Sequence, residues 1–166
     1  MKKNFFITIF VVFCVLILPN KGNSYSSDPK EFIQEVVDEA KKILVKTNSK
    51  EFKTKELSKM ALQTVDIKGV AYYTLGKYRK KLNDEQMNEY LKLFEKYFLK
   101  SFTSRLTDYS DPKIEVLSSD VLNEKYTIVK SLLLATDKKP EVHIDWRVYT
   151  KNPDKPLIRD LIIEGV

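Results

Sequence analysis

The chain has 166 residues, with 29 Lys and Arg, 23 Asp and Glu, one His and one Cys. One His and one Cys are too few for a structural zinc site, and four glycines scattered along the chain form no phosphate-binding loop. The formal net charge of +6 is too mild for a polybasic, nucleic-acid-binding chain, and the length fits a single domain.

The N-terminus has the layout of a secretory signal peptide. Lys2 and Lys3 precede an apolar run at residues 5–18, and small polar residues follow up to Ser24. An uncleaved membrane anchor is the alternative, but the run is shorter than the roughly 20 residues that span a bilayer. We therefore predict that residues 1–24 are a signal peptide, cleaved after Ser24, and that the protein is exported to the periplasm.

Residues 25–166 are then expected to form one domain without a cysteine, because Cys14 leaves with the signal peptide. Removal of Lys2, Lys3 and Lys21 lowers the formal net charge from +6 to +3. An exported chain without disulfides depends on its hydrophobic core, and this length is sufficient for one. Nucleic acid is not an expected partner.

The first predicted helix begins at Pro29, with Asp28 as its N-cap and Glu31 closing a capping box. It ends before Asn48 and Ser49, which break the pattern. Apolar residues recur along it at helical spacing and form one stripe: Phe32, Ile33, Val36, Val37, Ala40, Ile43 and Leu44.

Two shorter helices are predicted next. One covers residues 51–64, and the other runs from Asp66 as N-cap to Gly76 as C-cap. The residues predicted to point inward from the first of these are Phe52, Leu57, Met60 and Ala61.

The longest predicted helix covers residues 84–106, and Asn83 with Gln86 forms its capping box. Lys96 and Lys100 fall on the face opposite to its apolar stripe. A base-stacking surface needs cations beside its aromatic rings, so this arrangement disfavours nucleic-acid binding. The stripe consists of Met87, Leu91, Phe94, Phe98 and Phe102, with Tyr90 and Tyr97 at its edge.

After Tyr109 the hydrophobic period changes from helical to alternating. Four strands are predicted, separated by short turn signals, so neighbouring strands should be antiparallel. The predicted fold class is α+β, with N-terminal helices packed on a four-stranded antiparallel sheet. The strands cover residues 113–122, 125–136, 141–151 and 156–164.

The alternation in the third strand separates its side chains into two faces. His143, Asp145, Arg147 and Tyr149 share one face, while Val142, Ile144, Trp146 and Val148 share the other. His143 and Asp145 together leave a hydrolytic triad open, but no Ser stands in a nucleophile-elbow context. We therefore expect no catalytic residues and no enzyme.

Two stretches of the sequence carry recognisable motifs. The first, residues 65–109, holds Leu75, Gly76, Lys77, Tyr78, Phe94, Leu106 and Tyr109. The second comprises residues 142–149 and 158–166 and ends with Asp160, Glu164, Gly165 and Val166. The first stretch resembles the periplasmic phospholipid-binding proteins of the MlaC, or toluene-tolerance, family of the pathway that maintains outer-membrane lipid asymmetry, and the second is similar to the last two strands of that family.

The resemblance implies a monomeric carrier that holds a phospholipid by its acyl tails in a cavity between helices and sheet, without a cofactor. Its implied partners are an outer-membrane lipoprotein complex and an inner-membrane ABC transporter with an MCE-domain ring. Each implied lining residue could equally belong to an ordinary core. They are Leu75, Tyr78, Leu91, Phe94, Phe98, Val142, Ile144, Trp146, Val148, Leu161 and Ile163.

The chain departs from the family at its end, because family members usually continue past the Glu-Gly-Val sequence with a further helix. A C-terminally truncated or minimal domain is therefore expected. Three other interpretations stay open: a hopanoid-associated relative, an envelope interaction module with a filled core, and a small hydrolase.

Overall fold

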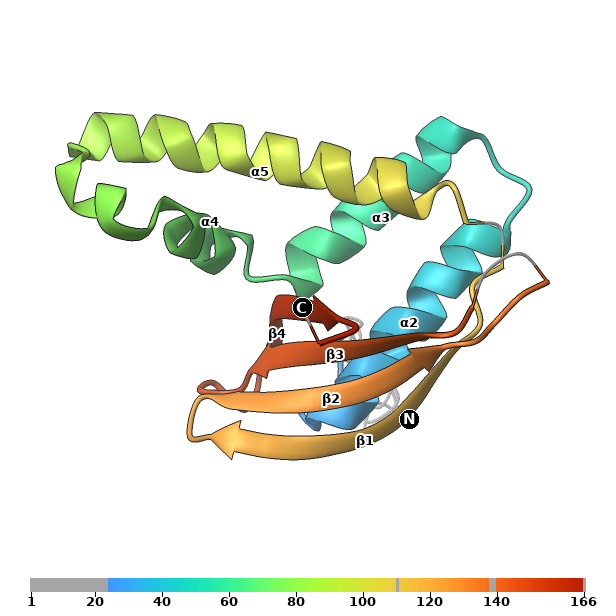
Figure 1. The fold of residues 1–166 in the computed structure, drawn as a ribbon. Helices are drawn as coiled ribbons and strands as arrows, with labels where there is room; N and C mark the ends of the chain where they lie inside the picture. The colour runs from blue at the N-terminus through green and yellow to red at the C-terminus, as the bar shows by residue number, and fades with distance from the viewer. Residues whose placement is uncertain (1–23, 110, 138–139, 166) are drawn as a thin grey trace, which may run out of the picture.

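A computed structural model describes residues 24–109, 111–137 and 140–165 (Figure 1). The predicted signal peptide lies, apart from Ser24, outside these residues. The predicted α+β fold is confirmed. Its elements are α2 (Pro29–Val45), α3 (Lys50–Thr64), α4 (Ile67–Leu75), the 3-10 helix η1 (Gly76–Lys81), α5 (Asp84–Leu106), β1 (Ile114–Asn123), β2 (Tyr126–Leu133), β3 (Val142–Tyr149) and β4 (Leu157–Ile163).

The predicted cap of α2 is confirmed in part. The Asp28 carboxylate accepts hydrogen bonds from the backbone N–H groups of Lys30 and Glu31, both at 2.9 Å. The predicted capping box with Glu31 is wrong, because the Ser26 hydroxyl takes its place. That hydroxyl accepts from the Asp28 N–H at 3.2 Å and donates to the Glu31 carboxylate at 2.9 Å.

The caps of α4 and α5 are confirmed. The Asp66 carboxylate accepts from the Gly69 N–H at 2.8 Å, and Asn83 and Gln86 exchange both bonds of a capping box at 2.9 and 3.1 Å. Gly76 ends α4 with φ +52°, a left-handed conformation that favours glycine. Ser49, predicted only as a breaker, caps α3 by accepting from the Phe52 N–H at 3.2 Å.

The sheet is antiparallel, with the strands side by side in chain order. β3 and β4 pair Val148 with Ile158 but Arg147 with Asp160, so Arg159 is an extra residue on β4. A β-bulge of this kind changes which side chains of a strand share a face.

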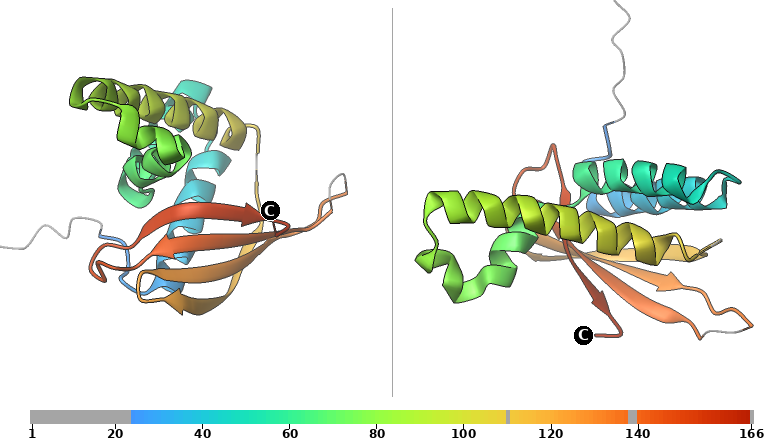
Figure 2. Two further views of the ribbon diagram at one scale, coloured as in Figure 1. Left: turned by 60° about the vertical axis from the view of Figure 1, so that its left-hand side comes forward. Right: turned by 90° about the horizontal axis from the view of Figure 1, so that it is seen from above.

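The helices cover one side of this sheet (Figures 1 and 2). α2 packs against β1 and β2, while α3 lies between α2 and α5 and reaches β4 at its end. The neighbours of α5 are mainly α3 and α4 rather than a strand. The closed core under α2 and α3 consists of Phe32, Ile33, Val36, Val37, Ile43, Leu44, Leu57, Met60, Val129, Val148 and Ile158.

One residue predicted to face this core does not. Phe52 is exposed, whereas the inward face of α3 is formed by Leu57, Met60, Ala61 and Thr64. Val65, just after α3, pairs with Ile158 of β4. Phe52 lies five residues before Leu57, a rotation of about 140° at ~100° per residue, so its side chain is on a different face of the helix.

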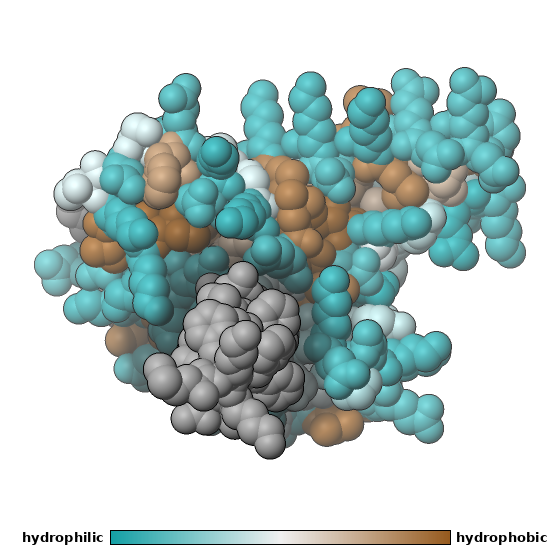
Figure 3. Space-filling view, turned by 180° about the vertical axis from the view of Figure 1, so that it is seen from behind, coloured by the Kyte–Doolittle hydropathy of each residue, from teal (hydrophilic) through white to brown (hydrophobic). Residues whose placement is uncertain are grey.

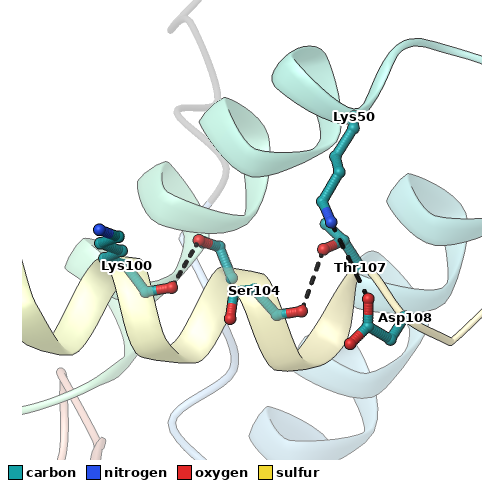
Figure 4. A network of polar contacts seen from close by, with 6 residues as sticks. Lys50, Lys100, Ser104, Thr107 and Asp108 are labelled. Carbon is teal, nitrogen blue, oxygen red and sulfur yellow. Dashed lines mark hydrogen bonds and ion pairs between the residues drawn. The ribbon is translucent and has the colours of Figure 1, made fainter.

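The C-terminal end of α5 is attached to the start of α3. Lys50 Nζ lies 3.9 Å from a carboxylate oxygen of Asp108, across the gap between the two helices (Figure 4). Both side chains are exposed, and such pairs contribute little to stability. Packing of Phe102 and Leu106 against the closed core therefore holds this end of α5.

Candidate lipid-binding surface

The face of the sheet that turns toward the helices is only half covered. Val148 and Ile158 are buried in the closed core, whereas Leu161 and Ile163 are 41% and 48% exposed. Leu161 pairs with Trp146 and Ile163 with Ile144, so these four apolar residues form a continuous patch on β3 and β4. Contiguous exposed apolar surface, in contrast to single exposed apolar residues, is a feature of binding sites.

The β-bulge at Arg159 places Leu161 and Ile163 on the core side of the sheet. Directly opposed residues of neighbouring strands share a face, so Ile158, Leu161 and Ile163 all lie on the side of Val148. Strict alternation along β4 would place Ile158 on the opposite side from the other two. Ile158 is therefore a further residue of this face, which alternation in the sequence does not indicate.

A ladder of aromatic rings runs along α5. Neighbouring centroids lie 5.8 Å apart for Tyr90 and Phe94, 6.4 Å for Phe94 and Phe98, and 5.9 Å for Phe98 and Phe102. Phe102 packs against the closed core, so the preceding rings continue the same stripe outward from it. The ladder thus runs from the closed core at Phe102 toward α4 at Tyr90.

The outer end of the ladder is attached to α4. The Tyr90 hydroxyl donates to the carbonyl oxygen of Ala71 at 3.1 Å, and burial raises the pKa of Tyr90. On the opposite face of α5, Lys96 and Lys100 are exposed as predicted. Seen from behind, hydrophilic side chains line the upper, helical edge of the molecule, and hydrophobic patches lie in a band beneath them (Figure 3).

Trp146 stands at the boundary between the closed core and the uncovered patch. Its indole N–H donates to the hydroxyl of Ser131 at 2.8 Å, and that hydroxyl donates to the carbonyl oxygen of Ile144 at 3.1 Å. Ser131 is buried, so these bonds hold the ring in one orientation. Nothing in the sequence marks Ser131 as the anchor of Trp146.

The structure places most of the predicted lining residues on two surfaces, the ladder of α5 and the patch of β3 and β4, and it places the others elsewhere. Val148 belongs to the closed core, and Tyr78 is exposed on η1 with the Lys77 and Lys81 ammonium groups 5.7 and 5.4 Å from its ring. Half-buried positions are taken by Leu75, Leu91, Phe94, Phe98, Val142, Ile144 and Trp146.

The predicted tail cavity between helices and sheet stays a prediction. Two pockets hollow the surface at other places: one of about 590 Å³ between α4 and β4, and one of about 410 Å³ beside Tyr25 and Pro156. Neither is lined by a predicted lipid-binding residue.

The lone histidine lies beside a carboxylate at the end of the sheet. His143 Nδ1 lies 3.8 Å from the Glu164 carboxylate, and the backbone N–H of His143 donates to the same oxygen at 2.6 Å. Within residues 24–109, 111–137 and 140–165, no three metal-ligating side chains come together. No helix in those ranges has the length and hydrophobicity required to cross a bilayer.

The chain belongs to the MlaC family, because the family model described as "MlaC protein" matches residues 30–166. Its fold is similar to that of a phospholipid-binding protein from Ralstonia solanacearum, solved in complex with a phospholipid. The TM-score is 0.66 at 15% identity, over 85% of this chain and 79% of that one. A comparison with curated proteins finds no match.

Proposed function

We propose that this protein is a phospholipid carrier rather than an enzyme. The acyl chains would lie between the aromatic ladder of α5 and the patch of β3 and β4. The observation that carries the proposal is the exposure of Leu161 and Ile163 on the core side of the sheet, which is the side that the helices cover (Figure 1). Membership of the MlaC family and the phospholipid in the similar structure support it.

The physics of such a carrier depends on its reference state. Burying a methylene gains about 0.8 kcal/mol against water, so a lipid with ~30 methylenes would gain ~24 kcal/mol. This exceeds the practical ceiling of roughly 18 to 21 kcal/mol for noncovalent affinity. The lipid instead leaves a bilayer that already hides its tails, so transfer is nearly balanced and its direction must come from partners.

The proposed setting is the periplasm, reached through the signal peptide at residues 1–24. There the protein would act as the soluble component of an MCE-type ABC lipid transport system. Its proposed partners are the inner-membrane transporter complex and an outer-membrane lipoprotein complex, between which it would move as a monomer. Export with cleavage near Ser24 would be tested by the mass of the protein in the osmotic-shock fraction of a Gram-negative host.

The decisive experiment is organic extraction of the purified protein followed by mass spectrometry. We expect phospholipid in stoichiometric amount. Protein that is free of phospholipid after gentle purification would contradict the carrier proposal and favour an envelope interaction module of the same fold.

A substitution pair tests where the lipid lies. Leu161→Trp adds volume to the uncovered patch, so we expect it to lower the bound phospholipid while the delipidated protein unfolds at nearly the same urea concentration as the parent. Leu57→Trp is the matched control, because Leu57 is fully buried and overpacking a core costs about 1 to 3 kcal/mol. Equal destabilisation by both, with unchanged lipid, would show that Leu161 is ordinary core.

A further inference from the structure

The pocket of about 590 Å³ between α4 and β4 has a different character from the apolar patch. Three basic side chains line it, from Lys68, Arg79 and Arg159, and one carboxylate, from Asp66. Tyr72, Tyr73, Gly69 and Gly76 complete the lining. The pocket and the apolar patch share no residue, so a ligand of the pocket can bind independently of acyl chains.

Two of the cations gather on a single ring. Lys68 Nζ lies 5.8 Å and Arg79 Cζ 5.5 Å from the centroid of Tyr72. Among the described residues neither cation forms an ion pair, so their charges are not neutralised within the protein. Two unpaired cations that line one pocket raise its local potential and favour the binding of an anion.

The third cation is held in place by close packing. Arg159 Nη2 lies 2.5 Å from the Asp66 carboxylate, and the guanidinium stacks 4.8 Å from the ring of Tyr149. The Nε of Arg159 is buried and has no hydrogen-bond partner among the described residues.

Gly69 makes this arrangement possible, because a Cβ at that position would stand 2.5 Å from Arg159 Cζ. The one carboxylate of the pocket is thus already paired with Arg159 and accepts the Gly69 N–H as well. The excess positive charge of Lys68 and Arg79 stays available to a ligand.

We propose that this pocket binds a phosphate group. A guanidinium group can donate two parallel hydrogen bonds to two oxygens of one phosphate. An ammonium group adds a positive point charge whose hydrogen bonds are less restricted in direction. The volume exceeds that of phosphate alone, so the pocket also accommodates the group that carries it. That group is either the headgroup of a phospholipid, which is a phosphodiester, or a small phosphorylated molecule.

The proposal is tested by NMR titration of the 15N-labelled protein with inorganic phosphate. We expect saturable shifts of the Gly69 and Gly76 amide signals, and at least about tenfold weaker binding in Lys68→Gln and Arg79→Gln, each of which loses a charge-assisted hydrogen bond. The control is Lys42→Gln, on the exposed side of α2, which removes the same charge away from the pocket. An undisturbed spectrum of each unliganded variant shows that it is folded.

A second titration with glycerophosphoglycerol, a headgroup without tails, distinguishes the two sources. Binding at least as tight as that of inorganic phosphate supports a lipid headgroup, and binding of inorganic phosphate alone supports a phosphorylated small molecule. The proposal is overturned if neither probe shifts the glycine signals, or if Lys42→Gln weakens binding as much as Arg79→Gln does.

Discussion

The two ends of β4 carry the same kind of side chain on the same face of the sheet, but the helices cover only one end. Ile158 is 6% exposed and belongs to the closed core, whereas Ile163 is 48% exposed. α3 ends beside Ile158, while the next helical layer, α5, rests on α3 and α4 instead of on the strands. Whether an isoleucine of β4 is buried or exposed is therefore decided by the helix that covers it.

This difference separates stability from the proposed function. Close packing under α2 and α3 stabilises the domain, because buried apolar area is the main favourable term in folding. Leu161 and Ile163 bury less apolar area and contribute less to folding, and the proposed function assigns their exposed surface to the lipid. The same comparison predicts how substitutions in each half will behave.

The largest effect on stability is expected in the closed half of the domain, where α2 and α3 cover the sheet. Ile158→Ala removes a buried side chain and should lower the free energy of unfolding by about 2 to 5 kcal/mol. Urea unfolding of delipidated protein measures it. A loss below about 1 kcal/mol would mean that the closed half is not packed as described.

The next effect is expected where the helices meet the edge of β4. The Asp66 N–H donates to the Ile158 carbonyl oxygen at 2.9 Å, while its carboxylate caps α4 and pairs with Arg159. Asp66→Ala should cost about 2 kcal/mol, reduced by the partial exposure of the ion pair. Asp66→Asn keeps a side chain that can cap α4, so it should lower the stability measured by thermal unfolding clearly less than Asp66→Ala does. Equal losses of stability in the two variants would show that the ion pair with Arg159 accounts for the whole effect.

A pH-dependent effect is expected at the start of the closed half. Tyr25 packs edge-on against Phe32 at 5.7 Å and donates its hydroxyl hydrogen to Glu39. Burial, and then this bond, raise the pKa of Tyr25 well above its ordinary value, so the folded state favours the neutral phenol. The resulting stability is fully present below the unfolded-state pKa of about 10 and is lost as the pH rises above it.

Tyr25→Phe should therefore cost about 1 kcal/mol at neutral pH and should flatten the decline of unfolding free energy above pH ~10. Urea unfolding at a series of pH values measures both quantities. Tyr73→Phe, at an exposed position, is the control. Parallel pH curves for the parent and Tyr25→Phe would contradict the role given to the Glu39 contact.

The smallest effect on stability is expected in the open half. Ile163→Ala should lower the unfolding free energy of delipidated protein by less than about 1 kcal/mol, because the side chain is already half exposed. It should instead reduce the phospholipid recovered by extraction. A loss as large as that of Ile158→Ala would remove the distinction between the two halves.

Local chemistry made the helices predictable. The caps at Asp28, Asp66 and Asn83 are formed by side chains that bond to backbone groups two or three residues away, so their sequence neighbours suffice to identify them. Two predictions about the caps were wrong because a nearby serine formed the bond instead. The Ser26 hydroxyl accepts the Asp28 N–H that was assigned to Glu31, and Ser49 caps α3 although it was predicted only to end the preceding helix.

The amino-acid sequence by itself determined the helix starts, the aromatic stripe of α5, the order of the four strands and, by resemblance, the family. Only the tertiary structure decided that Arg159 forms a bulge, that Ile158 is buried and Ile163 is not, and that Lys68, Arg79 and Arg159 line one pocket. The physical reason is the distance along the chain over which each interaction acts. Caps and periodicity act within a few residues, whereas register, coverage of a face and the meeting of distant charges depend on elements that are neighbours only after the chain has folded.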